Sequence, residues 1–285
     1  MNINYNVLIF VHIQKTAGAT LRSIIKRQYP KGSVLEIGKS HHHFPLEEFK
    51  RLELAERDRI DCLVGHIPYG LHEYLSRPAD YITFLRDPVE RAVSQFYYIC
   101  RRPSNRIYPL IQAKNFSLVD YVENDEYGRA DNMQIRYIIG AGPEAQMTQN
   151  ELEQAKVALL DRFVCFGLAE RFDDSLVLLR KALGWGRVYY VRQNVTKDRP
   201  ALTDIPKRVI KRFEEKYALD AELYEFGRRE FEKRVSSMGD TLGRELATLR
   251  MLNAVYGTLN RAKAILHPTN QSIIEETTGL LGSSR

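Results

Sequence analysis

The chain has 285 residues, of which 44% are hydrophobic, and it carries a formal net charge of +6 at pH 7. This length can bury a full α/β core, and the positive charge suits an anionic nucleotide, an anionic glycan or nucleic acid. The longest apolar run, Val7–Val11, is too short to span a membrane, and no signal peptide opens the sequence. Cys62, Cys100 and Cys165 form no CxxC pair, so we expect reduced thiols in a soluble, cytoplasmic protein.

Short apolar runs alternate with amphipathic stretches along the chain. Such alternation predicts a largely parallel sheet flanked by helices, which is an α/β fold. We expect one domain over residues 1–236 and a helical extension with a tail over residues 237–285. The expected strands are 6–13, 33–37, 62–66, 81–86, 164–168 and 188–191, and the expected helices are 19–28, 45–53, 89–100, 117–124, 151–159, 175–183, 205–217, 219–235 and 242–265.

The first strand ends in a polar turn, His12-Ile-Gln-Lys-Thr-Ala-Gly-Ala-Thr20, which leads directly into a helix. A helix N-terminus presents backbone N–H groups and partial positive charge, so the turn is suited to a phosphate or a similar anion. Lys15 adds a full positive charge within reach of the same anion. On these residues alone, an ordinary strand-to-helix turn is the alternative.

The turn resembles a P-loop but departs from its pattern. A Walker A sequence has a glycine directly before the lysine, whereas here Gln14 occupies that position and Gly18 follows the lysine. A loop without glycines ahead of the lysine cannot wrap closely around a triphosphate. We therefore expect a P-loop-NTPase-like sheet whose turn holds one or two anionic groups and does not hydrolyse ATP or GTP.

A second strand-to-helix turn lies at residues 85–88. Asp87 is a favourable N-cap and Pro88 a favourable first helical residue. Arg86 therefore lies at the carboxyl end of a strand, where open α/β sheets bind their ligands. An arginine with a nearby hydroxyl group can hold a second phosphate, and a local ion pair between Arg86 and Asp87 is the simpler alternative. Three residues follow on one face of the helix: Arg91, Ser94 and Tyr98.

Together these motifs resemble those of the carbohydrate sulfotransferases, most closely the heparan sulfate 6-O-sulfotransferases and next the 2-O-sulfotransferases. Residues 12–20 resemble the family's 5′-phosphosulfate loop, and residues 81–91 with Ser94 resemble its 3′-phosphate element. Ala17 and Ala19 replace residues that are usually glycine and a hydroxyl residue. Further segments that resemble the family are 131–136, 166–175 and 190–196.

Gly65-His66 with Leu71 resembles the segment that carries the family's catalytic histidine. The resemblance implies 3′-phosphoadenosine 5′-phosphosulfate (PAPS) as donor, a sugar hydroxyl as acceptor and no metal. It makes His66 the general base, which suits a residue type that exchanges a proton near neutral pH. Lys15 would neutralise the charge that develops on the leaving phosphate. His72 is the rival base.

The resemblance also assigns binding residues, all of which are expectations at this point. No motif indicates an oligomeric state. The acceptor would contact Tyr98, Arg136 and His72, although a core or rim role fits Tyr98 and Arg136 at least as well. The donor would be held by His12, Gln14, Lys15, Thr16, Ala17, Gly18, Ala19, Thr20, Arg86, Ser94, Arg192, Asn194 and Thr196.

Two other classes of function compete with this interpretation. A nucleotide or small-molecule kinase shares the sheet and the Lys15-Thr16 pair, but it needs a complete Walker A sequence and a magnesium-binding carboxylate. A non-catalytic polyanion binder needs only basic charge, and we expect no nucleic-acid partner. The run His41-His42-His43 has no spacing that completes a metal site, so a solvated run is the simpler interpretation.

Overall fold

The computed structural model describes residues 6–38, 44–105, 107–113, 116–123, 131–191 and 200–266. Within these ranges, five strands form one parallel sheet in the order β2-β3-β1-β4-β5. This confirms the α/β class and five of the six expected strands. The strands are β1 Val7–Val11, β2 Val34–Ile37, β3 Cys62–Gly65, β4 Ala79–Leu85 and β5 Phe163–Leu168.

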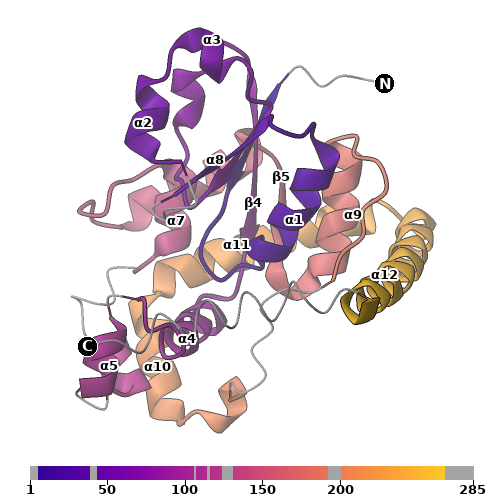
Figure 1. Cartoon of the computed structure of the whole chain (residues 1–285). Coiled ribbons are helices and arrows are strands. Elements are labelled where there is room, and N and C mark those ends of the chain that lie inside the picture. Colours follow the sequence, from indigo (N-terminus) through magenta and orange to yellow (C-terminus); the bar gives the residue numbers. More distant parts are fainter. Residues whose placement is uncertain are drawn as a thin grey trace, which may run out of the picture.

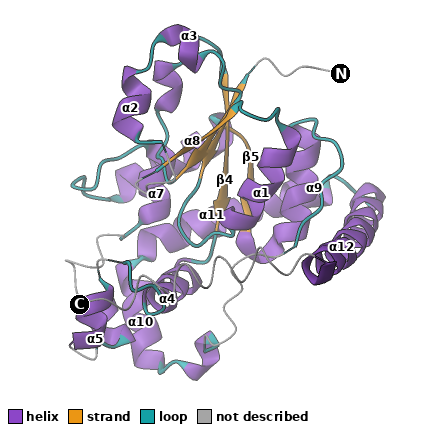
Figure 2. Ribbon diagram, in the orientation of Figure 1, coloured by secondary structure: helices purple, strands orange, loops and turns teal. Residues whose placement is uncertain are grey.

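Helices lie on both sides of the sheet (Figure 1), and Figure 2 shows the strands enclosed between them. Helix α1 (Gly18–Gln28) and α9 (Phe172–Ala182) lie on one side, while α7 (Met133–Ile139) and α8 (Gln149–Asp161) lie on the other. The remaining helices are α2 Leu46–Arg51, α3 Leu54–Arg57, α4 Pro88–Ile99, α5 Tyr108–Ala113, α6 Leu118–Glu123, α10 Lys207–Lys216, α11 Ala218–Ser236 and α12 Asp240–Leu266, with short 3-10 turns at Leu71–Tyr74, Ala169–Arg171 and Leu202–Asp204.

The strand expected over residues 188–191 is wrong, because these residues are irregular. The N–H of Tyr190 donates to the side chain of Asn253 in α12 at 2.7 Å, and the Tyr190 ring packs on Phe172 with centroids 5.0 Å apart. The apolar character that suggested a strand therefore serves packing against helices. The helix expected over residues 45–53 is also divided, into α2 and α3, and α5 and α7 were not predicted.

Two apolar clusters stabilise the fold. The main core surrounds the sheet, and β1 is buried along its whole length. A second cluster joins α4, α5, α6 and α10, and it lies beside the carboxyl edge of the sheet because α4 begins directly after β4. Helix α12 packs on α9, where Arg180 and Glu245 form an ion pair at 2.7 Å. The division at residue 236 stays a prediction.

Candidate active site

Three neighbouring strands deliver the candidate residues to one edge of the sheet. Val11 at the end of β1 lies opposite Gly65 in β3 and Thr83 in β4. Because the strands are parallel, the turns that follow them meet at the same edge, which is where open α/β sheets bind ligands. The turns carry His12 with Lys15, His66 and Arg86, respectively.

His66 is held by His12. Its Nδ1 lies 2.8 Å from the His12 carbonyl oxygen, and the two rings stack with centroids 4.2 Å apart. Because a carbonyl oxygen only accepts, Nδ1 carries the proton, and Nε2 is the basic nitrogen of the neutral ring. His66 is exposed, so the geometry is that of a base that can meet a substrate.

The position of the His12 ring explains why residue 18 of the turn is a glycine. This ring also stacks on Phe10, with centroids 5.3 Å apart. A Cβ atom added to Gly18 would lie only 1.9 Å from His12 Nε2. Any side chain at Gly18 would therefore push His12 out of its stack with His66.

The turn between β1 and α1 has an unusual backbone. Lys15 and Ala17 adopt left-handed conformations, with φ of 67° and 65°, each of which costs about 1–2 kcal/mol for a residue with a side chain. Glycine avoids this cost, which explains why glycine is usual where Ala17 stands. The turn is held by buried Thr16, whose hydroxyl donates to the Ile13 carbonyl at 2.8 Å.

Tyr98 of α4 contacts Lys15. The Lys15 ammonium lies 4.3 Å from the centre of the Tyr98 ring, and the Arg102 guanidinium lies 5.2 Å from the same centre. A cation over an aromatic face is attracted by about 0.5–2 kcal/mol. Tyr98 therefore orients Lys15, and its contact with an acceptor stays a prediction.

Arg86 links the two strand-to-helix turns. Its Nη1 donates to the Lys15 carbonyl at 3.0 Å, and its Nη2 pairs with Glu90 at 3.1 Å. Its Nε lies 3.8 Å from Glu170, and burial raises the pKa of that carboxyl group. The helix start expected here is confirmed, because Asp87 Oδ1 accepts the Glu90 N–H at 2.8 Å and Pro88 opens α4.

The other candidates on α4 point inward. Ser94 is 7% exposed. Arg91 is only 1% exposed, lies 5.9 Å from the ring centre of Tyr217 and donates to the sulfur of Met133. Arg91 is therefore part of the packing beneath the candidate site, and the contact of Ser94 with the donor stays a prediction.

Two residues expected to contact the acceptor have structural partners. His72 Nδ1 and its backbone nitrogen both lie 2.9 Å from the hydroxyl of Tyr81, a residue in the middle of β4. Arg136 donates to Asp131 and to the carbonyls of Gly142 and Ala145. The contacts of His72 favour His66 over His72 as the base. The contacts of Arg136 hold together the segment from Asp131 to Ala145.

Several expected residues lie outside the part of the chain that the structure describes. They are the donor-binding candidates Arg192, Asn194 and Thr196 and the run His41-His42-His43. Among the described residues, no cluster of acidic, cysteine and histidine side chains has the arrangement of a metal site. Within the same ranges, no helix is long and apolar enough to cross a membrane.

Gln134 was missed by sequence reasoning. Its side chain is fully buried, its Oε1 accepts the Arg86 N–H at 2.9 Å, and its Nε2 donates to the Arg86 carbonyl at 2.9 Å. The only signal was its place within the segment 131–136, which resembles an Asn/Gln/Arg segment of the family, but that resemblance gave the glutamine no role. Glu90 and Glu170, the ionic partners of Arg86, were missed in the same way.

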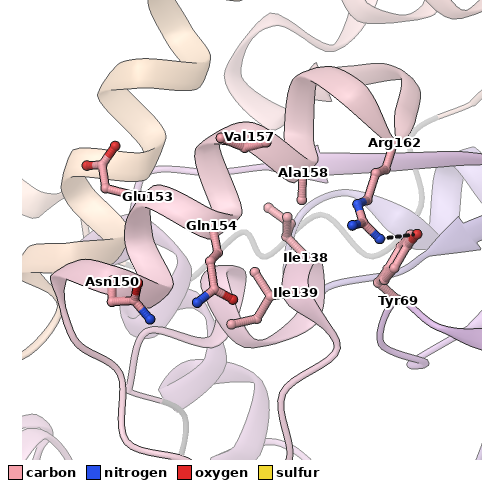
Figure 3. A pocket seen from close by; sticks show the side chains of 9 residues that line it. All are labelled: Tyr69, Ile138, Ile139, Asn150, Glu153, Gln154, Val157, Ala158 and Arg162. Atoms are coloured by element: carbon pink, nitrogen blue, oxygen red, sulfur yellow. Dashed lines mark hydrogen bonds between the residues drawn. The ribbon is translucent and has the colours of Figure 1, made fainter.

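A separate cavity of about 400 Å³ lies between α7, α8 and Tyr69 (Figure 3). The Arg162 guanidinium donates to the Tyr69 hydroxyl at 2.8 Å across one end of it. Arg162 directly precedes β5, so this end faces the amino edge of the sheet, opposite to the turns that carry Lys15 and Arg86. The cavity is therefore not the centre of the candidate site.

The parallel sheet in the order β2-β3-β1-β4-β5, with helices on both sides, defines an α/β protein of the P-loop-NTPase-like class. A family model described as galactose-3-O-sulfotransferase matches residues 3–264. The chain belongs to this family. The expected resemblance to carbohydrate sulfotransferases is confirmed, although the matching family is the galactose 3-O branch and not a heparan sulfate branch.

Individual relatives agree with this assignment. The chain is 26% identical to mouse galactosylceramide sulfotransferase over 267 residues, covering 86% of this chain and 62% of that protein. It is also 26% identical to human heparan-sulfate 6-O-sulfotransferase 2, covering 82% of this chain and 46% of that protein. The chain thus spans less than two thirds of either relative. The structure of mouse sulfotransferase SULT7A1 complexed with PAP is similar at a TM-score of 0.34 and 14% identity, covering 78% of this chain and 68% of that one.

Proposed function

We propose that the protein transfers the sulfuryl group of PAPS to a hydroxyl group of a carbohydrate. The observation that carries this proposal is the meeting of Lys15, His66 and Arg86 at the carboxyl ends of three adjacent strands. Two cationic side chains on separate turns suit a nucleotide that carries two separated phosphate groups. Family membership supports the same reaction.

The proposed chemistry uses His66, Lys15 and the backbone N–H groups at the start of α1. The acceptor hydroxyl loses its proton to Nε2 of His66 as its oxygen forms a bond to sulfur. The bond between sulfur and the bridging oxygen breaks, and its electron pair stays on the departing 5′-phosphate. Lys15 and the backbone N–H groups at the start of α1 stabilise that charge. The protonated His66 is supported by the His12 carbonyl on its Nδ1 side.

The acceptor we propose is a carbohydrate with an accessible galactose. This part of the proposal is supported by the description of the matching family and by the name of the mouse relative, a galactosylceramide sulfotransferase. We also propose a cytoplasmic location, which is supported by the three cysteines, all free and two of them buried.

Calorimetric titration with 3′-phosphoadenosine 5′-phosphate (PAP), the desulfated donor, tests the proposal. We expect micromolar binding without magnesium and no comparable binding of ATP. Equal binding of ATP, or none of PAP, would contradict the proposal and favour the kinase or polyanion-binding alternatives. Transfer from labelled PAPS to galactosides and to glucosides then tests the acceptor, and transfer to glucosides alone would exclude galactose.

A further inference from the structure

We propose that Gln134 is a positioning residue for the donor. It fixes the backbone of Arg86 and thereby sets the preference of the site for nucleotides that carry a 3′-phosphate. The inference rests on the proposed function, since it names what one buried amide does for the donor site. It is carried by contacts among residues that lie far apart in the sequence.

The amide of Gln134 satisfies both backbone polar groups of Arg86. Its Oε1 accepts the N–H and its Nε2 donates to the carbonyl, each at 2.9 Å. Strand β4 ends at Leu85, so Arg86 is the first residue beyond the strand. The amide supplies the pair of hydrogen bonds that a neighbouring strand would otherwise make. The Cα atom from which the guanidinium extends is therefore fixed.

Gln134 is itself held rigidly. Its N–H donates to Oδ2 of Asp220 at 3.1 Å, and the N–H of Ile135 donates to Oδ1 of the same carboxylate at 3.0 Å. The N–H of Asp220 in turn donates to the side chain of Asn132 at 2.9 Å. Gln134 and Asp220 are both fully buried. An acidic side chain at the first turn of a helix stabilises that end, so α11 anchors α7 and α7 anchors Arg86.

Loss of the Gln134 side chain should weaken the binding of nucleotides that carry a 3′-phosphate more than the binding of nucleotides that lack one. Arg86 is the candidate for the 3′-phosphate, and the loss of one hydrogen bond to a charged group of this kind weakens binding by about tenfold to a hundredfold. The turn that faces the 5′-group keeps its own contact between Thr16 and Ile13. A hydrogen bond from the Arg86 guanidinium to the Lys15 carbonyl also joins this turn to Arg86. Because the donor is charged, the weakening of this bond should reduce binding of the 5′-group by about tenfold.

The test is titration of wild type and Gln134→Met with PAP and with 5′-AMP, which lacks the 3′-phosphate. Methionine has a similar length but forms neither strong hydrogen bond. We expect the Kd of PAP to rise by about a hundredfold and that of 5′-AMP by about tenfold. The matched control is Thr83→Val, which removes the buried bond to the Val11 carbonyl and should leave the ratio of the two Kd values unchanged.

A double-mutant cycle separates positioning from general support of the fold. In an Arg86→Ala background, Gln134→Met should not weaken PAP binding further, because the two residues act as one unit. The inference would be overturned if Gln134→Met raised the Kd values of PAP and 5′-AMP by the same factor, or if it left the Kd of PAP unchanged. A wild-type protein that does not bind PAP would instead overturn the proposed function itself.

A second variant serves if Gln134→Met fails to fold in a thermal melt. Gln134→Glu keeps the acceptor oxygen, but an ionised carboxylate cannot donate to the Arg86 carbonyl. The protonated carboxyl group restores that donor. The Kd of PAP for this variant, divided by the wild-type value at the same pH, should therefore fall as the pH is lowered. A ratio that does not change with pH would count against the inference.

Discussion

Gly18→Ala tests whether the stack of His12 on His66 serves the reaction. The added Cβ would lie 1.9 Å from His12 Nε2, whereas ordinary contact begins at 3.4 Å, so the ring must move by 3.4 − 1.9 = 1.5 Å. The ring is confined between Phe10 and His66, so this movement displaces His66. Overpacking of this kind costs about 1–3 kcal/mol of the free energy of unfolding.

The displaced base should slow transfer more than it weakens donor binding. We expect kcat to fall by about a hundredfold, the usual cost of moving a reacting group by about 1 Å. The measurements are sulfate transfer from labelled PAPS, calorimetric titration with PAP and unfolding in urea. Gly18→Ala with wild-type kcat would refute the role of the stack, even if the protein were less stable.

Gly243→Ala is the matched control for this experiment. Gly243 lies inside α12, and a Cβ added there meets no atom within 4 Å. Alanine is a better helix former than glycine by about 0.5–1 kcal/mol. This variant should therefore be slightly more stable than wild type and equally active, so that a glycine-to-alanine change as such does not account for the result at Gly18.

Three further predictions concern the proposed base, the lysine and alkaline stability. His66→Ala should bind PAP as wild type does but lose transfer by about 10²–10⁴-fold, and transfer at the wild-type rate would show that another group is the base. Lys15→Ala should both weaken PAP binding in calorimetry and lower kcat, and an effect on neither would remove Lys15 from the site. Burial raises the pKa of Tyr81 from 10.0 to about 12, so its contribution to stability is full below pH 10 and is lost as the pH rises towards 12. Tyr81→Phe should reduce the fall in unfolding free energy over that window, and an unchanged slope in urea titrations would contradict this.

Most of the fold follows from local sequence patterns, but α7 does not. Strands β1 to β5 are short apolar runs bounded by polar turns, and Asp87-Pro88 marks the start of α4 without reference to the rest of the chain. Helix α7 instead begins after Asn132, which has a left-handed φ of 47°. Its first N–H groups are satisfied by Asp220, a residue 86 positions further along. No local pattern contains that information, because the partner is brought there only by the packing of α11.

The same distinction applies to the candidate site. Lys15 follows a predicted strand, and His66 and Arg86 each end one, so their meeting at one edge could be predicted from the parallel sheet. The residues that hold Arg86 in place could not be predicted in this way. Gln134 is 48 residues from it, and Glu170 reaches the same turn by way of its bond to the Asp87 N–H, across 83 residues. Sequence patterns identify the groups that would face a ligand, whereas the residues that hold them depend on tertiary packing.

Arg86 makes the two turns a single site. Its guanidinium donates to the carbonyl of Lys15, a residue held in a left-handed conformation that costs about 1–2 kcal/mol. One hydrogen bond to a charged donor is worth about 1.5–3 kcal/mol, which is enough to offset that cost. The side chain at the end of β4 therefore supports the conformation of the first turn, together with the bond from Thr16 to the Ile13 carbonyl within that turn. Lys15 and Arg86, the two candidate anion-binding residues, are separated by 71 residues in the sequence, yet one chain of contacts from α7 to the start of α1 positions both.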